Sequence, residues 1–196
     1  MNKLNAKTIS ICGVLTAMTI VLAEFLGVNL PMIQISFNFI PLIFSALCFG
    51  PVYTCIIAAL ADFLGVILFQ GGGFNPMFTI IAALAGLAYG MWLYDGSPVN
   101  RAIRGAVRKL CRNSANADRI GGIVAAFIAS VFNSVVFTLI CTPVVLHIWY
   151  KLSYAALYPS RLVKVAVMIP LETVVISLVE TQVIPRLKKT SMLKKA

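Results

Sequence analysis

Charged residues are scarce in this chain. Of its 196 residues, 11% are charged, six are acidic and one is histidine, while 60% are hydrophobic. Soluble globular domains carry roughly 25% charged and 45–50% apolar residues. The composition therefore excludes a soluble domain and predicts an integral membrane protein. At about 20 residues for each spanning helix, residues 1–196 have room for a single transmembrane domain.

Catalytic and redox motifs are also missing from the sequence. There is no HExxH, GxSxG or Walker lysine loop, and the single histidine is His147. The five cysteines contain no CxxC pair and lie mostly in apolar runs, so we interpret them as small buried hydrophobic residues. We therefore predict no enzyme, metal site or cofactor. Any active transport must draw its energy from an ion gradient or from other subunits.

Six apolar runs divide the chain. They predict one bundle of transmembrane helices at about residues 8–28, 35–49, 52–69, 77–94, 120–148 and 162–184. A basic loop, residues 95–119, separates the fourth run from the fifth. Within it Arg101, Arg104 and Arg108 recur at helical spacing and predict an amphipathic helix on the membrane surface. Nucleic-acid binding is the weaker interpretation, because basic loops beside membrane spans are what the positive-inside rule produces.

The positions of lysine and arginine predict the topology. With six spans and a cytoplasmic N-terminus, the cytoplasmic side receives two of these residues in the N-terminal lead, six in the basic loop and five in the C-terminal tail. That is thirteen of 16. Such an asymmetry is typical of cytoplasmic segments. We therefore expect an all-α membrane protein with both termini in the cytoplasm, and Lys151, Arg161 and Lys164 on the outer side.

Two of these outer cations form a pattern that is typical of anion binding. Arg161 and Lys164 are one helical turn apart, so their side chains are expected to point the same way. They predict a cationic clamp for a carboxylate, with interfacial snorkelling as the alternative. Asp62 and Asn133 interrupt apolar runs and are costly in lipid, so we expect both in the bundle interior. For Asp62, a structural hydrogen bond and a ligand contact remain open.

Connections on the outer side add further candidates. Segment 27–37 is too apolar for an ordinary solvated loop and is expected at the interface or over a cavity. The loop 70–76 holds a glycine triplet followed by Phe74 and Asn75, which suits a cover better than a tight turn. Gly13 and Ala17 form a small-xxx-small ridge on the first helix. This ridge predicts close helix packing, either inside the protein or against a partner subunit.

Three stretches carry a family resemblance. They are ISFNFIPLIFSALCFGPVYTCIIAALADFLGVILF, GGGFNPMFTIIAALAGLAYG and YPSRLVKVAVMIPLE, and together they resemble the S components, the substrate-binding subunits, of energy-coupling-factor (ECF) vitamin transporters, most closely the folate-type members. Their most specific pieces are the ISF-F-P entry, the FGP turn followed by ALADFLG, and SRLVK-x3-MIP. The sequence departs from the family pattern at Gly13, where an alanine is usual, and in the length of loop 95–119.

The resemblance implies a six-helix, multi-pass protein of the bacterial cell membrane that captures a vitamin from the outer face. It implies partners as well: a transmembrane T subunit that would meet Gly13 and Ala17, and two cytoplasmic ATPases that would supply the energy. The loaded subunit would then topple in the membrane to release its cargo inside.

Folate and pantothenate both carry carboxylates, so the clamp does not separate them. Aromatic residues able to stack on a pterin favour folate. The candidate substrate-binding residues are Phe37, Asn38, Asp62, Phe74, Asn75, Asn133, Arg161 and Lys164. Two alternatives remain open: an S component for pantothenate, and a stand-alone secondary transporter that uses Asp62 and Glu172 as proton sites.

Overall fold

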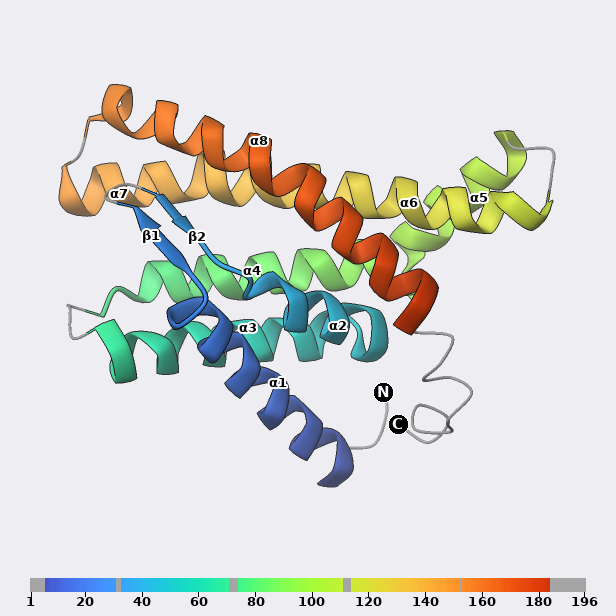
Figure 1. The fold of residues 1–196 in the computed structure, drawn as a ribbon, viewed down its shortest axis with the longest axis horizontal. Coiled ribbons are helices and arrows are strands. Elements are labelled where there is room, and N and C mark those ends of the chain that lie inside the picture. The colour runs from blue at the N-terminus through green and yellow to red at the C-terminus, as the bar shows by residue number, and fades with distance from the viewer. Residues whose placement is uncertain (1–5, 31–32, 71–73, 111–113, 152, 184–196) are drawn as a thin grey trace.

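The computed structural model describes residues 6–30, 33–70, 74–110, 114–151 and 153–183 (Figure 1). The glycine triplet 71–73, Cys111 and the C-terminal basic tail lie outside the described residues. The α-helices are α1 (Ala6–Glu24), α2 (Phe39–Phe49), α3 (Pro51–Gly65), α4 (Pro76–Leu93), α5 (Pro98–Leu110), α6 (Ser114–Asn133), α7 (Thr142–Tyr150) and α8 (Tyr154–Leu178). Three π-helical segments, η1 (Val66–Gln70), η2 (Ser134–Cys141) and η3 (Val179–Val183), extend α3, α6 and α8.

Membrane-spanning capacity is clear for four helical segments. Pro51–Phe69, Pro76–Leu110, Arg119–Tyr150 and Leu157–Gln182 are long and apolar enough to cross a bilayer. Two further apolar helices, Thr8–Glu24 and Phe39–Phe49, are shorter. The described residues are therefore overwhelmingly helical, as the composition predicts.

One short hairpin departs from the all-α expectation. The first helix ends at Glu24 rather than at residue 28, and the connection folds into the antiparallel strands β1 (Val28–Leu30) and β2 (Ile33–Ile35). Val28 pairs with Ile35 and Leu30 with Ile33. A two-stranded ladder satisfies the backbone polar groups of a segment that is too apolar for an open loop.

The bundle has two distinct ends. The β1–β2 hairpin, α7 and the start of α8 lie at one end, and α5 lies with the end of α8 at the other (Figure 1). We call these the hairpin end and the α5 end. The last helix begins at Tyr154 rather than at the predicted residue 162, and Pro159 lies in its first turns. Pro159 is the sixth residue of α8, so it lacks the N–H that would reach the carbonyl of Ala155, and the helix has one backbone hydrogen bond fewer at this point.

Helices α3 and α4 pack at very close range. A Cβ atom on Gly86 would lie 2.8 Å from the Cβ of Ala58, and one on Gly90 would meet the backbone of Pro51. The reversal between α2 and α3 is made by Gly50 at φ 87°, a value that favours glycine. Ala82, Gly86 and Gly90 form a ridge at a spacing of four in the fourth apolar run, a pattern that predicts close helix packing. The contacts at Gly86 and Gly90 agree with this prediction. The main core lies between α2, α4, α6 and α8, around Ile43, Leu93, Ala126 and Ile176.

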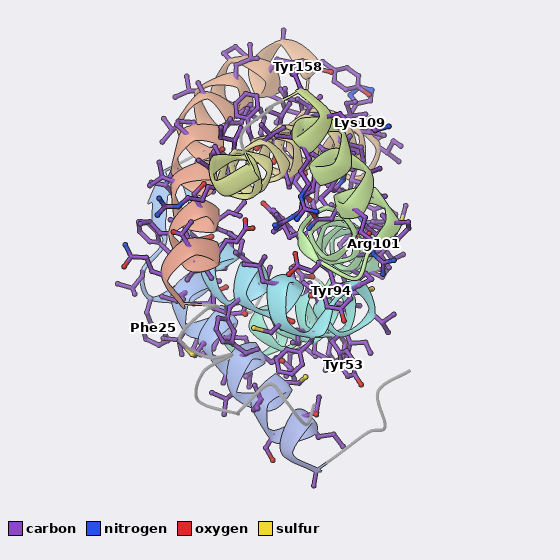
Figure 2. The ribbon with its side chains drawn as sticks, turned by 90° about the vertical axis from the view of Figure 1, so that its right-hand side faces the viewer. Phe25, Tyr53, Tyr94, Arg101, Lys109 and Tyr158 are labelled. Carbon is purple, nitrogen blue, oxygen red and sulfur yellow. The ribbon has the colours of Figure 1, made fainter. Side chains whose placement is uncertain are left out.

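The basic loop contains the helix α5, and side-chain contacts hold this helix against the bundle. Arg104 of α5 is paired with Glu180 of η3 and lies 3.2 Å from Asp95, and its Nε donates a 2.7 Å hydrogen bond to Asn100. Asn100 is fully buried and donates to the carbonyl oxygen of Leu93 at 2.7 Å. The inner face of α5 is therefore anchored to the ends of α4 and α8. Arg101 and Lys109 lie on its outer side (Figure 2).

Replacing Arg104 with glutamine should lower the free energy of unfolding by about 1–2 kcal/mol, because Glu180 would remain partly buried without its charged donor. Thermal unfolding in detergent measures this loss. Lys109→Gln on the exposed side of α5 is the matched control, and it should change stability by less than about 0.5 kcal/mol. Equal effects of the two substitutions would contradict an anchoring role for Arg104.

Candidate functional site

A cavity of about 240 Å³ lies inside the bundle. It is lined by residues of α1, α2, α3, α4, α6, η2 and α8, and its walls mix small apolar side chains with polar ones. The polar and charged residues that line it are Thr19, Asn38, Asp62, Tyr89, Asn133, Ser134, Thr138, Lys164 and Glu172. Ionisable groups this deep in a membrane protein mark a functional site by default, because burying them in lipid is costly.

Helix α8 supplies the charged wall. Lys164, Val165, Met168 and Glu172 line the cavity from one stripe of this helix. Lys164 and Glu172 are eight positions apart, which is about 12 Å along the helix axis. Since α8 runs from the hairpin end to the α5 end, the cation lies nearer the hairpin end and the carboxylate lies deeper. Lys164 is half-buried, and Glu172 is 5% exposed.

Glu172 has a specific partner on the facing helix. The hydroxyl of Tyr89 in α4 donates a 2.7 Å hydrogen bond to its Oε2. Tyr89 is itself 5% exposed, so the pair is closed off from solvent. A buried carboxylate needs such a donor, because an unsatisfied charge in the interior is strongly unfavourable. The pair joins α4 to α8 deep in the cavity and leaves the second carboxylate oxygen for another donor.

Asp62 and Asn133 face the same cavity from α3 and α6. Oδ2 of Asp62 accepts a 2.7 Å hydrogen bond from the hydroxyl of Thr79 in α4. The amide nitrogen of Asn133 donates to the carbonyl of Ala129 at 3.2 Å, whereas its Oδ1 is buried with no hydrogen-bond partner among the described residues. Buried polar atoms are nearly always paired. Oδ1 of Asn133 is therefore an acceptor suited to a ligand or to water.

The helix changes geometry immediately after Asn133. Segment η2 is π-helical, and it contributes Ser134, Phe137 and Thr138 to the cavity wall. Wide π turns occur frequently at functional sites. The sequence places a proline, Pro143, in the outer third of this long helix, where a kink is expected. Pro143 lies at the start of α7 and has no N–H to reach the carbonyl of Leu139, and the irregular segment η2 lies in the turns immediately before it.

The predicted site residues divide into two groups. Asn38, Asp62, Asn133 and Lys164 line the cavity. The other four, Phe37, Phe74, Asn75 and Arg161, are not among its lining residues.

Each residue of the second group has a different setting. Phe37 and Phe74 are 37% and 44% exposed, and Phe74 packs edge-on against Phe63 at 5.3 Å between ring centroids. Asn75 caps α4, with its Oδ1 accepting a 3.0 Å hydrogen bond from the backbone N–H of Met77. Nε of Arg161 is buried without a hydrogen-bond partner among the described residues.

Sequence reasoning missed Tyr89. Glu172 is costly in lipid and was expected in the bundle interior, but it was not among the predicted substrate-binding residues. Tyr89 follows the ridge residue Gly86 by three positions, in a run interpreted as a packing surface. A tyrosine inside a helix of small residues could have indicated a buried polar contact, because a buried hydroxyl needs a hydrogen-bond partner.

A family model described as "ECF transporter, substrate-specific component" matches residues 7–180. The chain belongs to this family. The Folate transporter FolT of Clostridium novyi (strain NT) is 29% identical to this S component over 161 residues, which cover 80% of this chain and 78% of that protein. FolT of Leuconostoc mesenteroides subsp. mesenteroides is 30% identical over 89 residues, 45% of this chain and 48% of that protein.

A solved structure is similar over most of the S component. The crystal structure of FolT bound with folic acid matches it with a TM-score of 0.72 and 26% sequence identity, over 89% of this chain and 93% of that chain. The resemblance read from the sequence is therefore confirmed. The protein is the substrate-specific component of a membrane transporter rather than an enzyme, which argues against a stand-alone secondary transporter.

Proposed function

We propose that this S component captures folate. The observation that carries the proposal is the similarity, over nearly nine-tenths of the chain, to a FolT structure that contains folic acid. The cavity supports it with a lysine near one end and hydrogen-bonding acceptors in its depth. Folate has a matching distribution of groups, with carboxylates on its glutamate tail and N–H donors on its pterin ring.

The size of the cavity favours one orientation. Ligand pockets for drug-sized molecules are typically about 300–1,000 Å³, whereas this one is about 240 Å³. The cavity therefore suits the pterin head, and the tail would extend toward the hairpin end. In this orientation Lys164 attracts a tail carboxylate, while Glu172, Asp62 and Oδ1 of Asn133 accept hydrogen bonds from the ring.

Arg161 then has a supporting position. It precedes Lys164 by one helical turn toward the hairpin end, where a tail that leaves the cavity would pass. Phe37 and Phe74 do not line the cavity, so they would stack on the ligand only after moving toward it. Asn75 would act indirectly, by fixing the start of α4 beneath the loop.

The proposal includes a six-span topology. The spans are α1, α2, α3 with η1, α4, α6 through α7, and α8, in a bacterial plasma membrane. The α5 end and both termini would be cytoplasmic, which fits the basic residues of α5.

The proposed partners are a T-type subunit and two ATPase subunits. On α1, Gly13 and Ala17 are exposed, and a Cβ on Gly13 would have nothing within 4 Å. The ridge is therefore open in the isolated chain, as docking of the T-type subunit requires.

Calorimetric titration of the detergent-purified chain with folate, and separately with pantothenate, tests the substrate. We expect one folate site with sub-micromolar affinity and no heat from pantothenate, because the depth of the cavity offers acceptors for a ring with several N–H donors. Tight pantothenate binding would reassign the substrate. If neither ligand gives binding heat and the chain still unfolds cooperatively, the isolated subunit does not contain a complete site.

A further inference from the structure

A second hollow lies on the outside of the bundle, between α6 and α8 near the α5 end. Its volume is about 460 Å³. We call it the α6–α8 groove, and the residues that line it include Arg119, Ile123, Thr173, Val174, Ser177 and Leu178. Ile123, Val174 and Leu178 are 47%, 58% and 50% exposed. Apolar exposure of this kind on a membrane-spanning helix pair places the groove against lipid rather than water.

The hydroxyl groups in the groove do not make it a polar site. Thr173, Ser177 and Thr181 each donate a hydrogen bond to the backbone carbonyl four residues earlier, at 2.7, 2.8 and 2.7 Å. Their donor protons are therefore used within α8 and its extension η3. What remains toward the groove is methyl and methylene surface with weak acceptor character. Such a surface suits a hydrocarbon chain better than a polar ligand.

One charge marks an end of the groove. Arg119 is exposed, and it makes no ion pair with the side chains that the structure describes. Helices α6 and α8 run in opposite directions (Figure 1). Arg119 near the start of α6 therefore lies at the level of Thr181 in η3, which extends α8. From Thr181 to Thr173 the groove follows about 12 Å of helix. One leaflet of a bilayer has about 15 Å of hydrocarbon, half of the full core.

We propose that the α6–α8 groove binds an anionic phospholipid, with one acyl chain along Thr173–Thr181 and the headgroup phosphate at Arg119. A guanidinium at the edge of the hydrocarbon recognises a phosphate through paired N–H donors. The neighbouring helix α5, with Arg101 and Lys109 on its outer side, adds positive potential at the same end of the bundle. The apolar part of the groove therefore matches the acyl chain of a phospholipid, and the cation at its end matches the headgroup phosphate.

Native mass spectrometry of the detergent-purified chain tests the site with three probes: dioleoyl phosphatidylglycerol, dioleoyl phosphatidylcholine and glycerol 3-phosphate. We expect one retained phosphatidylglycerol per chain, weaker retention of phosphatidylcholine, and none of glycerol 3-phosphate. Arg119→Gln should reduce phosphatidylglycerol retention by about fivefold, the scale of one basic residue beside an anionic lipid. Arg101→Gln, an exposed arginine of α5, is the charge-matched control and should reduce retention less than Arg119→Gln does.

A second variant tests the slot itself. Val174→Trp fills the groove from an exposed position, so it should remove phosphatidylglycerol retention without altering folate binding. Equal retention of both phospholipids by the wild type would overturn the proposal in favour of a nonspecific lipid shell. If Arg119→Gln and Arg101→Gln lose phosphatidylglycerol retention equally, the proposal would be overturned in favour of diffuse electrostatic attraction. Binding of glycerol 3-phosphate would overturn it in favour of a simple anion site. Unchanged retention in Val174→Trp would remove the groove as the location.

Discussion

Replacing Lys164 with methionine should weaken folate binding by about 10- to 150-fold. The lysine is the cation that lines the cavity, and it is half-buried, so its attraction for a carboxylate is screened less than at an exposed position. Losing a hydrogen bond to a charged group costs about 1.5–3 kcal/mol, which corresponds to this range of affinity. Methionine keeps the apolar stem of the side chain, so the packing of α8 is preserved. Calorimetric titration with folate measures the change.

Three controls separate charge recognition from a structural effect. Lys164→Arg keeps the charge and should lose less affinity, although its fork geometry differs. Lys151→Met removes an exposed cation at the hairpin end and should leave affinity unchanged. The third control is a ligand, 6-hydroxymethylpterin, which has no carboxylate. If Lys164→Met weakens the binding of 6-hydroxymethylpterin as much as the binding of folate, the lysine does not recognise the carboxylate tail.

Most of the fold could be predicted because the bilayer restricts it so strongly. Spanning segments need about 20 apolar residues and must satisfy their backbone within each helix. The six apolar runs therefore coincide with helical segments, and the glycine spacing at Gly86 and Gly90 marks the close contact of α3 with α4. Helix ends were less predictable. The start of α8 at Tyr154 and the β1–β2 hairpin depend on local backbone hydrogen bonding, which the apolar pattern does not encode.

About half of the predicted site residues line the cavity, because lipid also restricts where polar residues can lie. A charge or amide inside an apolar run is visible in the sequence, and three such residues, Asp62, Asn133 and Lys164, line the cavity. The depth of the cavity was not visible. Arg161 and Lys164 share a helix face, but of these two residues only Lys164 lines the cavity. The cavity follows α8 from Lys164 inward to Glu172, away from Arg161.

Pairings between distant residues escaped the sequence altogether. Tyr89 and Glu172 are 83 positions apart, and Arg104 and Glu180 are 76 apart. A single sequence shows which residues are costly to bury, but not which partner satisfies them. The basic loop shows the limit most clearly. Its charge was interpreted through topology, whereas Arg104 is part of a specific anchor between α5 and the end of α8.

Substituting Gly90 with alanine should destabilise the protein by about 3 kcal/mol, the upper part of the range for overpacked cores. The added Cβ would collide with the backbone of Pro51, at the reversal where Gly50 already fixes the entry to α3. The backbone at such a turn cannot move aside to make room for the added Cβ, as a flexible side chain could. For a chain of this size the loss corresponds to a fall of about 6–12 °C in the unfolding midpoint. Thermal unfolding in detergent measures it directly.

Gly105 in α5 is the matched control because it predicts the opposite sign. A Cβ atom there has nothing within 4 Å, and the residue lies inside a helix. Alanine in place of a helical glycine stabilises by about 0.5–1 kcal/mol. The same chemical change should therefore lower the unfolding midpoint at Gly90 and raise it at Gly105. A neutral Gly90→Ala would mean that α3 and α4 can separate at low cost. The wall that these two helices form around Asp62, Thr79 and Tyr89 would then be adaptable rather than rigid.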